Sequence, residues 1–153
     1  MLPNVELLEQ PAQPALTIRT WASLQELPGV LGQTLGSLRQ YLAEHGRQPS
    51  GPPFVAYHNM DMQNLDLEIG IPVEERLEGQ GAIRPGCIPG GRLAACTFTG
   101  PSQDLGLAYA ELARLVETRG LRATGVAYEL YLNDPQTTPP QQLQTRILFP
   151  LKG

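Results

Sequence analysis

The residues best suited to chemistry lie together in one apolar stretch, residues 126–135. Glu129 stands in its middle, with Tyr128 before it and Tyr131 after it. The apolar and aromatic composition predicts a strand, and the Asn-Asp-Pro ending is a strong turn signal. Because side chains alternate along a strand, we expect Glu129 and Tyr131 on the same face. A carboxylate in such a strand is either solvated or forms the floor of an apolar pocket, where it attracts cations or exchanges protons.

The other residues that could act in catalysis or bind a metal form no recognisable motif. His45 and His58 have no organised nucleophile beside them in the sequence, and there is no nucleophile elbow, phosphate loop or dinucleotide fingerprint. Cys87 and Cys96 are not part of a Cys-x-x-Cys pair or a histidine cluster, so we expect no zinc or other metal site and no cofactor. Cys96 falls in an apolar run and is predicted to be a small buried hydrophobe.

Composition narrows the class of protein. The chain has 153 residues, 41% hydrophobic and 17% charged, with a net charge of −4, which is typical of one soluble globular domain. The eleven lysines and arginines form no basic run, which argues against nucleic-acid binding. The first residues lack the pattern of an export signal, and no apolar stretch approaches the roughly 20 residues that span a bilayer. We therefore expect a cytoplasmic protein with no membrane partner.

The first half of the chain reads as strand, helix, strand, strand. Residues 15–21 predict a strand, and Ser23 with Glu26 has the spacing of a capping box. An amphipathic helix follows and ends at Gly46, and residues 54–60 and 65–71 predict two further strands. Gly32 and Gly36, four apart in the helix, are expected to let it lie close to a sheet. The helix is predicted to bury one leucine stripe: Leu31, Leu35, Leu38 and Leu42.

The second half repeats this order. A strand at residues 90–98 precedes a helix that Asp104 could cap and that ends at Gly120, and strands at 126–132 and 143–149 follow. Sliding the sequence by 77 positions pairs Trp21 with Phe98, and sliding it by 78 pairs Ile69 with Ile147. Agreement of element order, turn positions and core positions indicates an internal duplication.

This duplication predicts an α+β fold of the whole chain, 1–153, as a single domain, with repeats at about 4–75 and 82–152. Two strand-helix-strand-strand units would pack about a pseudo-twofold axis, as an antiparallel curved sheet with helices on one face and a central ligand pocket. We expect the pocket to be lined by strand residues that point away from the helices. Those side chains are Tyr57, Glu129 and Tyr131, with Trp21 and Phe98 at the rim. Glu68 is a second candidate carboxylate, and its alternative is a solvated face.

Four stretches carry a family resemblance: residues 51–57, 65–73, 128–135 and 145–151. The most specific is the Tyr-Glu-x-Tyr-Leu-Asn-Asp-Pro run that begins at Tyr128. With these stretches the chain resembles the GyrI-like family, the small-molecule-binding domain that is also the effector domain of multidrug-sensing bacterial transcription regulators. The resemblance implies a central aromatic pocket, in which the glutamate that matches Glu129 attracts lipophilic cations.

Three functions stay open on these grounds. The first is capture of aromatic, hydrophobic and often cationic compounds, with Glu129 as anchor and Tyr57, Tyr131 and Trp21 as walls. Tyr109, on the second helix, is predicted to pack in the core. The second, implied by the resemblance, is hydrolysis of cyclopropane-bearing DNA-alkylating natural products, with Glu129 as base and Tyr57 or Tyr131 as donor. The third is a protein-interaction module such as a gyrase inhibitor.

The regulators of this family carry a helix-turn-helix region before the effector domain. Only a few residues precede Val5 in this sequence, so we expect a stand-alone chain that does not bind DNA directly. The expected partner is an aromatic or cationic small molecule, and a protein partner or a homodimer is possible.

Overall fold

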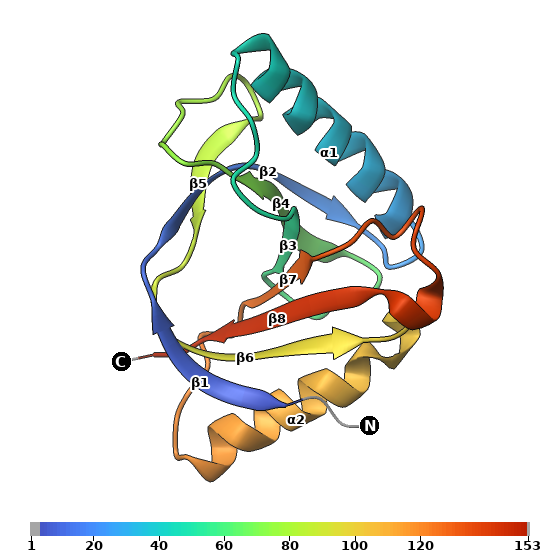
Figure 1. Cartoon of the computed structure of the whole chain (residues 1–153). Coiled ribbons are helices and arrows are strands. Elements are labelled where there is room, and N and C mark those ends of the chain that lie inside the picture. Colours follow the sequence, from blue (N-terminus) through green and yellow to red (C-terminus); the bar gives the residue numbers. More distant parts are fainter. Residues whose placement is uncertain (1–3, 153) are drawn as a thin grey trace. The chain divides into compact units, whose positions relative to one another are not determined.

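The structure, a computed structural model, describes residues 4–152 and divides into two compact units (Figure 1). One unit is Ala12–Pro89, which we call the α1 unit. The other, the α2 unit, consists of the segments up to Pro11 and from Gly90 onward. The expectation of no export signal concerns in part Met1, Leu2 and Pro3, which lie outside the described residues.

The α1 unit is a four-stranded antiparallel sheet with one helix. Its strands follow the order β3-β4-β2-β5, and helix α1 packs against β2 and β4 (Figure 1). The element bounds are β2 (Gln13–Ala22), α1 (Leu27–Glu44), β3 (Phe54–Tyr57), β4 (Leu65–Pro72) and β5 (Arg84–Ile88).

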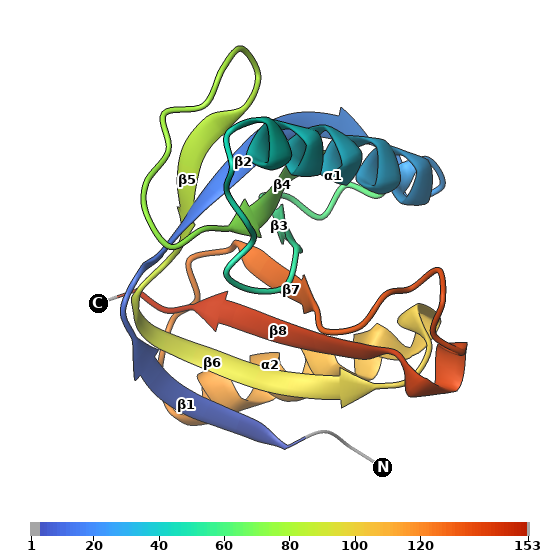
Figure 2. The same ribbon diagram turned by 45° about the horizontal axis from the view of Figure 1, so that its top comes forward.

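The α2 unit has the same plan. Its strands follow the order β1-β6-β8-β7, all antiparallel, and helix α2 runs along the sheet face beside β6 and β8 (Figure 2). The element bounds are β1 (Val5–Gln10), β6 (Gly91–Thr99), α2 (Leu105–Thr118), β7 (Ala127–Tyr131) and β8 (Gln144–Pro150), with short 3-10 turns η1 (Ser102–Asp104) and η2 (Pro140–Gln142).

The predicted α+β class and the repeated strand-helix-strand-strand order are confirmed, as β2-α1-β3-β4 and β6-α2-β7-β8. Each unit also contains a fourth, outer strand: β5 lies beside β2, and β1 lies beside β6. The sequence did not predict β5, because Pro85 and Gly86 interrupt any strand pattern. An edge strand tolerates both residues, since one side of its backbone needs no partner.

Helix ends follow the sequence signals in most places. Ser23 and Glu26 form the predicted capping box: the Ser23 N–H donates to Glu26 Oε1 at 2.9 Å and the Glu26 N–H to Ser23 Oγ at 3.2 Å. Gly46 and Gly120 end the two helices with positive φ angles of 64° and 68°, the left-handed conformation that glycine adopts without steric cost. The predicted side-chain cap by Asp104 is wrong, because its carboxylate makes no capping hydrogen bond.

Strand register corrects one part of the predicted duplication. In the α1 unit Ile69 lies opposite Ile18 and Val55, and in the α2 unit Ile147 lies opposite Cys96 and Glu129. Equivalent residues of β2 and β6, such as Ile18 and Cys96, are therefore 78 positions apart in the sequence, not 77.

The predicted equivalence of Trp21 and Phe98 is wrong for this reason, and Thr20 is the true counterpart of Phe98. A slip of one residue moves a side chain to the other face of a sheet. Accordingly Trp21 is 56% exposed and Phe98 only 6%.

The close approach expected at the helix glycines occurs elsewhere. Gly32 and Gly36 are exposed, and a Cβ atom at either would meet nothing within 4 Å. At Gly70, in β4, a Cβ atom would lie 2.5 Å from the Phe54 ring and 2.9 Å from the Thr17 methyl group. The backbone of β4 is therefore in contact with two side chains of its neighbouring strands.

We expect Gly70→Ala to destabilise the protein by about 1–3 kcal/mol, because the fully buried Phe54 ring has no room to move aside. Gly36→Ala is the matched control. It should leave stability unchanged or raise it by up to about 1 kcal/mol, since alanine favours a helix and meets no neighbour. Urea unfolding of the three proteins measures the difference. Equal midpoints for both variants would contradict the close approach at Gly70.

Candidate functional site

Glu129 faces helix α2. It lies opposite Ile147 in the sheet, and Ile147 lies opposite Cys96, so the three side chains share one face. Ile147 and Cys96 belong to the buried cluster that packs against α2. The expectation that Glu129 points away from the helices is therefore wrong. The alternation of the strand was predicted correctly, but the sequence does not say which face the helix covers.

Two tyrosine hydroxyls hold the Glu129 carboxylate, which is only 6% exposed. The Tyr109 hydroxyl, from α2, donates a hydrogen bond to Oε2. The Tyr131 hydroxyl donates to Oε1 at 3.1 Å, as expected for side chains two apart on one strand face. Each carboxylate oxygen thus has a phenol donor, and hydrogen bonds to a charged acceptor stabilise it more than neutral ones do.

The prediction that Tyr109 only packs in the core is incomplete. Its ring does pack, with its centroid 5.6 Å from that of Phe149 at an interplanar angle of 55°, but its hydroxyl reaches Glu129. The surroundings are apolar, and burial raises the pKa of the Cys96 thiol on the same face to about 11. The buried cluster consists of Ala94, Cys96, Phe98, Ala108, Leu112, Val116 and Ile147.

The α1 unit has no counterpart of this polar pair. The helix-ending hydrogen bonds, Arg47 N–H to Leu42 and Leu121 N–H to Val116, align Gly46 with Gly120. They place Leu35 where the α2 unit has Tyr109.

Strand register likewise places Val55 where the α2 unit has Glu129. Leu35 and Val55 are 7% and 0% exposed. When the two helices are aligned by the glycines that end them, rather than by their leucines, Tyr109 matches the apolar Leu35. This alignment is the sequence signal that would have shown that Tyr109 differs from its counterpart.

The other predicted site residues lie as follows. Phe98, expected at a rim, is instead part of the buried cluster against α2, in the row that contains Thr145 and Tyr131. Tyr57 lies opposite Leu67 in the α1 unit, whereas Glu68 lies opposite Ala56, so Tyr57 and Glu68 point to opposite faces of that sheet. Whether Tyr57, Trp21, Phe98 and Glu68 contact a ligand stays a prediction.

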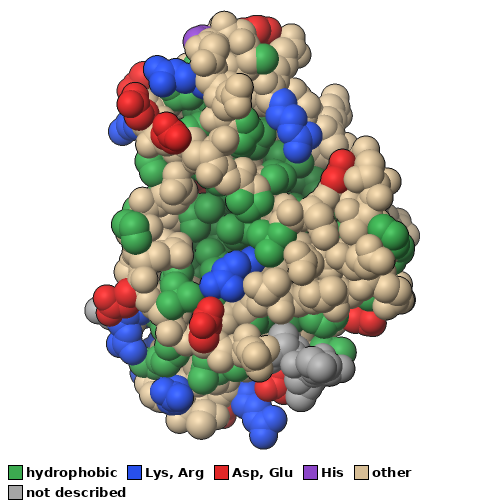
Figure 3. Space-filling view, in the orientation of Figure 1, with side chains coloured by type: hydrophobic (Ala, Val, Ile, Leu, Met, Phe, Trp, Pro, Cys, Tyr) green, Lys and Arg blue, Asp and Glu red, His purple; other side chains and the backbone are tan. Residues whose placement is uncertain are grey.

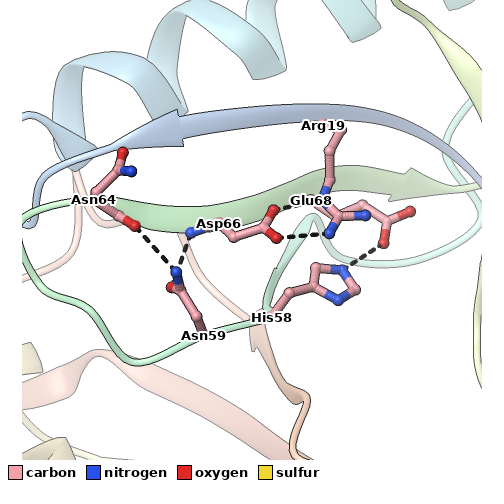
Figure 4. Close-up of polar contacts among 6 residues, drawn as sticks. All are labelled: Arg19, His58, Asn59, Asn64, Asp66 and Glu68. Atoms are coloured by element: carbon pink, nitrogen blue, oxygen red, sulfur yellow. Dashed lines mark hydrogen bonds and ion pairs between the residues drawn. The ribbon is translucent and has the colours of Figure 1, made fainter.

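Glu68 belongs to a polar cluster in the α1 unit (Figure 4). Its Oε1 lies 3.0 Å from His58 Nε2, and each side chain is about one-fifth exposed. Beside this pair, Arg19 binds both oxygens of Asp66, at 2.6 and 2.8 Å. The hydrogen bonds from Arg19 hold the pKa of the Asp66 carboxyl below its ordinary value. His58, which the sequence left without a partner, therefore has an acidic one.

The hollows on the surface of the α1 unit lie away from the predicted site residues. Two open hollows of about 340 and 410 Å³ lie on the α1 unit, around the link of residues 46–49, and neither contains a predicted site residue.

Within residues 4–152, no three histidine, cysteine, aspartate or glutamate side chains are grouped so that they could hold a metal ion. No helix in this range is long and apolar enough to cross a membrane. Lysine and arginine side chains are spread singly over the face shown in Figure 3.

The class of this protein follows from its match to one family. The family model of the GyrI-like small molecule binding domain matches residues 3–152. The chain belongs to the GyrI-like family. No curated protein matches the sequence significantly.

Solved structures of similar fold share little sequence with this GyrI-like chain. The C-terminal domain of EcmrR has a TM-score of 0.82 at 23% identity, with 99% of each chain covered. A hydrolase from Listeria innocua has a TM-score of 0.74 at 13% identity, with 97% and 91% covered. SAV2435 bound to tetraphenylphosphonium has a TM-score of 0.66 at 10% identity, with 98% and 94% covered.

The chain spans 58% of the EcmrR chain in the EcmrR–DNA complex, where the TM-score is 0.85 at 22% identity. At such identities these likenesses show the fold alone.

We expect Tyr109→Phe to lower the free energy of unfolding by about 1–3 kcal/mol, because the ring packing stays while the buried Glu129 carboxylate loses a donor. The control is Tyr41→Phe, whose ring stacks on His45 near the end of α1 and should change stability by less than about 0.5 kcal/mol. Urea unfolding measures both. Equal losses would show that the Tyr109 hydroxyl contributes nothing to the fold.

Arg19→Met tests the ion pair with Asp66. A carboxyl whose folded-state pKa lies below its unfolded value, about 3.9, stabilises the fold above that pH and loses this contribution as the pH falls through the folded value. We expect the variant to be less stable by about 0.5–1 kcal/mol at pH 7, since Arg19 is partly exposed. The difference should shrink toward pH 3 in urea unfolding. Arg114→Met, which removes an exposed helix pair with Glu111, should show a smaller loss at pH 7.

Proposed function

We propose that this GyrI-like chain binds aromatic, hydrophobic cations, with Glu129 as the charge anchor and Tyr109 and Tyr131 as its immediate neighbours. The observation that carries the proposal is a carboxylate 6% exposed, held by two phenol hydroxyls on an apolar sheet face. A charge in such surroundings is weakly screened and attracts a cation strongly. Aromatic rings add roughly 0.5–2 kcal/mol for each cation they face.

The comparison between the two units supports a functional role for this carboxylate. Burial of an ionisable group is costly unless partners compensate it, and an apolar pair of similar volume serves a fold at least as well. The α1 unit has Leu35 and Val55 at the matching positions, both buried. Because the repeated architecture forms with apolar residues there, the Tyr109–Glu129 pair is not required by the fold itself.

A ligand that contacts Glu129 must replace groups that cover it. The Tyr109 hydroxyl is one such group, because it already occupies one carboxylate oxygen. A cation would take over this interaction, while Tyr131 keeps its hold on the other oxygen. A similar protein, SAV2435, has been solved with tetraphenylphosphonium, an aromatic cation, which makes that compound the natural first probe.

Titration with tetraphenylphosphonium should show binding that Glu129→Gln weakens about tenfold or more, or at least about 1.4 kcal/mol. The glutamine keeps the shape of the side chain and removes its charge. Triphenylphosphine oxide, a neutral aromatic of similar form, should bind the two proteins within about twofold of each other. Isothermal titration calorimetry gives both affinities.

Glu111→Gln is the control for a general charge effect, since Glu111 is an acidic residue on α2 whose partner is the exposed Arg114. It should bind tetraphenylphosphonium as the wild type does. The proposal fails if Glu129→Gln weakens the cation and the neutral compound equally, or if Glu111→Gln has the same effect as Glu129→Gln.

A second candidate is hydrolytic opening of an activated cyclopropane, and the adjacency of a carboxylate and two phenols favours it. Glu129 would take a proton from water while the water oxygen bonds to a ring carbon. The electron pair of the broken ring bond would move to a conjugated carbonyl oxygen, which a tyrosine hydroxyl protonates. A ring-opened, hydrated product that forms with the wild type but not with Glu129→Gln, although both bind the compound, would decide for catalysis.

A further inference from the structure

Large apolar side chains are exposed together at one end of the α1 unit. Among residues 4–152 six large hydrophobic side chains are strongly exposed, and four of them lie at the end of β2 and in the β3–β4 loop. The Leu24 N–H donates to the Met62 carbonyl at 2.8 Å and joins these two segments. We call the four residues the Trp-Met patch: Trp21, Leu24, Met60 and Met62, which are 56%, 53%, 60% and 48% exposed.

The loop that presents the methionines is tied down by its own hydrogen bonds. Asn59 Oδ1 accepts from the Asp66 N–H at 2.9 Å and Asn59 Nδ2 donates to the Asn64 carbonyl at 3.1 Å (Figure 4). Asp61 Oδ1 and its carbonyl oxygen accept from the N–H groups of Gln63 and Asn64. These hydrogen bonds order the backbone of the loop, so a partner would meet two methionine side chains on an ordered backbone.

The charges around the patch select the kind of partner. Glu26 and Asp61 are acidic residues, and both are exposed. The positive charge of Arg19 is bound by both oxygens of Asp66. The surface is thus apolar with an acidic border. A second copy that docks through the same patch would bring Glu26 and Asp61 of the two copies together, and like charges repel.

We propose that the Trp-Met patch docks a basic amphipathic helix of another protein. An exposed tryptophan is a typical anchor of such contacts, and methionine side chains adapt to different apolar faces. A helix with leucines on one face and lysines on its borders would cover the patch and pair with Glu26 and Asp61. The partner of this surface is a protein, whereas the ligand proposed for Glu129 is a small molecule.

Trp21 is the only tryptophan of the chain, so its fluorescence reports directly on coverage of the patch. The probe is a peptide of about 14 leucines and lysines with leucine at helical spacing, and its leucine–glutamate counterpart is the charge control. The lysine peptide should shift Trp21 emission to shorter wavelength in a saturable way. The glutamate peptide should leave the emission unchanged.

Variants test the location of the contact. Met60→Ser combined with Met62→Ser should raise the Kd for the lysine peptide about tenfold or more, and Glu26→Gln combined with Asp61→Asn should raise it about threefold or more. Leu107→Ser is the control, because Leu107 is 54% exposed but lies on α2. Its Kd should equal that of the wild type.

Several results would overturn the proposal. One is a Kd for the lysine peptide that is the same in the double methionine variant and the wild type. Another is an equal shift of Trp21 emission with the lysine and the glutamate peptide. A shift on raising the protein concentration alone would assign the patch to a second copy of the chain. A shift with phosphatidylcholine vesicles and none with the lysine peptide would assign it to a lipid surface.

Discussion

The buried Glu129 carboxylate, which the hydroxyls of Tyr109 and Tyr131 bind, sets the strictest requirement on the residues around it in the α2 unit. The bond from Tyr109 joins helix α2 to β7, and the bond from Tyr131 lies within β7, so a carboxylate that is 6% exposed has one donor from the helix and one from its own strand. Each phenol replaces a hydrogen bond that the carboxylate would make with water, and without them a buried charge would be very costly. The apolar cluster around Phe98 and Leu112 surrounds this polar centre and strengthens its electrostatics.

The two units show how one architecture accommodates different chemistry. Both have a four-stranded antiparallel sheet and a helix that ends at a left-handed glycine. Both also have an equivalent row of paired strand residues, which contains Ile69 in one unit and Ile147 in the other. In the α1 unit the helix and strand positions of this row are Leu35 and Val55. In the α2 unit they are Tyr109 and Glu129. The chain belongs to a family of small-molecule-binding domains, and the difference between the units supports the proposal that Glu129 is the charge anchor.

Polar residues of the α1 unit are arranged differently. Arg19 and Asp66 form an ion pair at the sheet, His58 and Glu68 are in hydrogen-bond contact beside it, and Asn59 binds the backbone of the neighbouring loop. None of these side chains is as deeply buried as Glu129, so each pair contributes modestly to stability. The hydrogen bonds of Asn59 hold the backbone of the loop that carries Met60 and Met62, and these two side chains are exposed to solvent.

The sequence by itself determined the order of helices and strands, the capping box at Ser23, the shared face of Glu129 and Tyr131, and the family. Local signals suffice for these features, because alternation, helix ends and turn residues act over a few positions. Tertiary structure decided which face of β7 the helix covers, that Tyr109 binds Glu129, that β5 is a strand, and that Trp21 does not match Phe98. A period of two places side chains on opposite faces without saying which face is buried, and a register error of one residue exchanges the two. The sequence pointed to Glu129 as a candidate site residue. Its contact with Tyr109 on α2 depends on how helix and sheet pack.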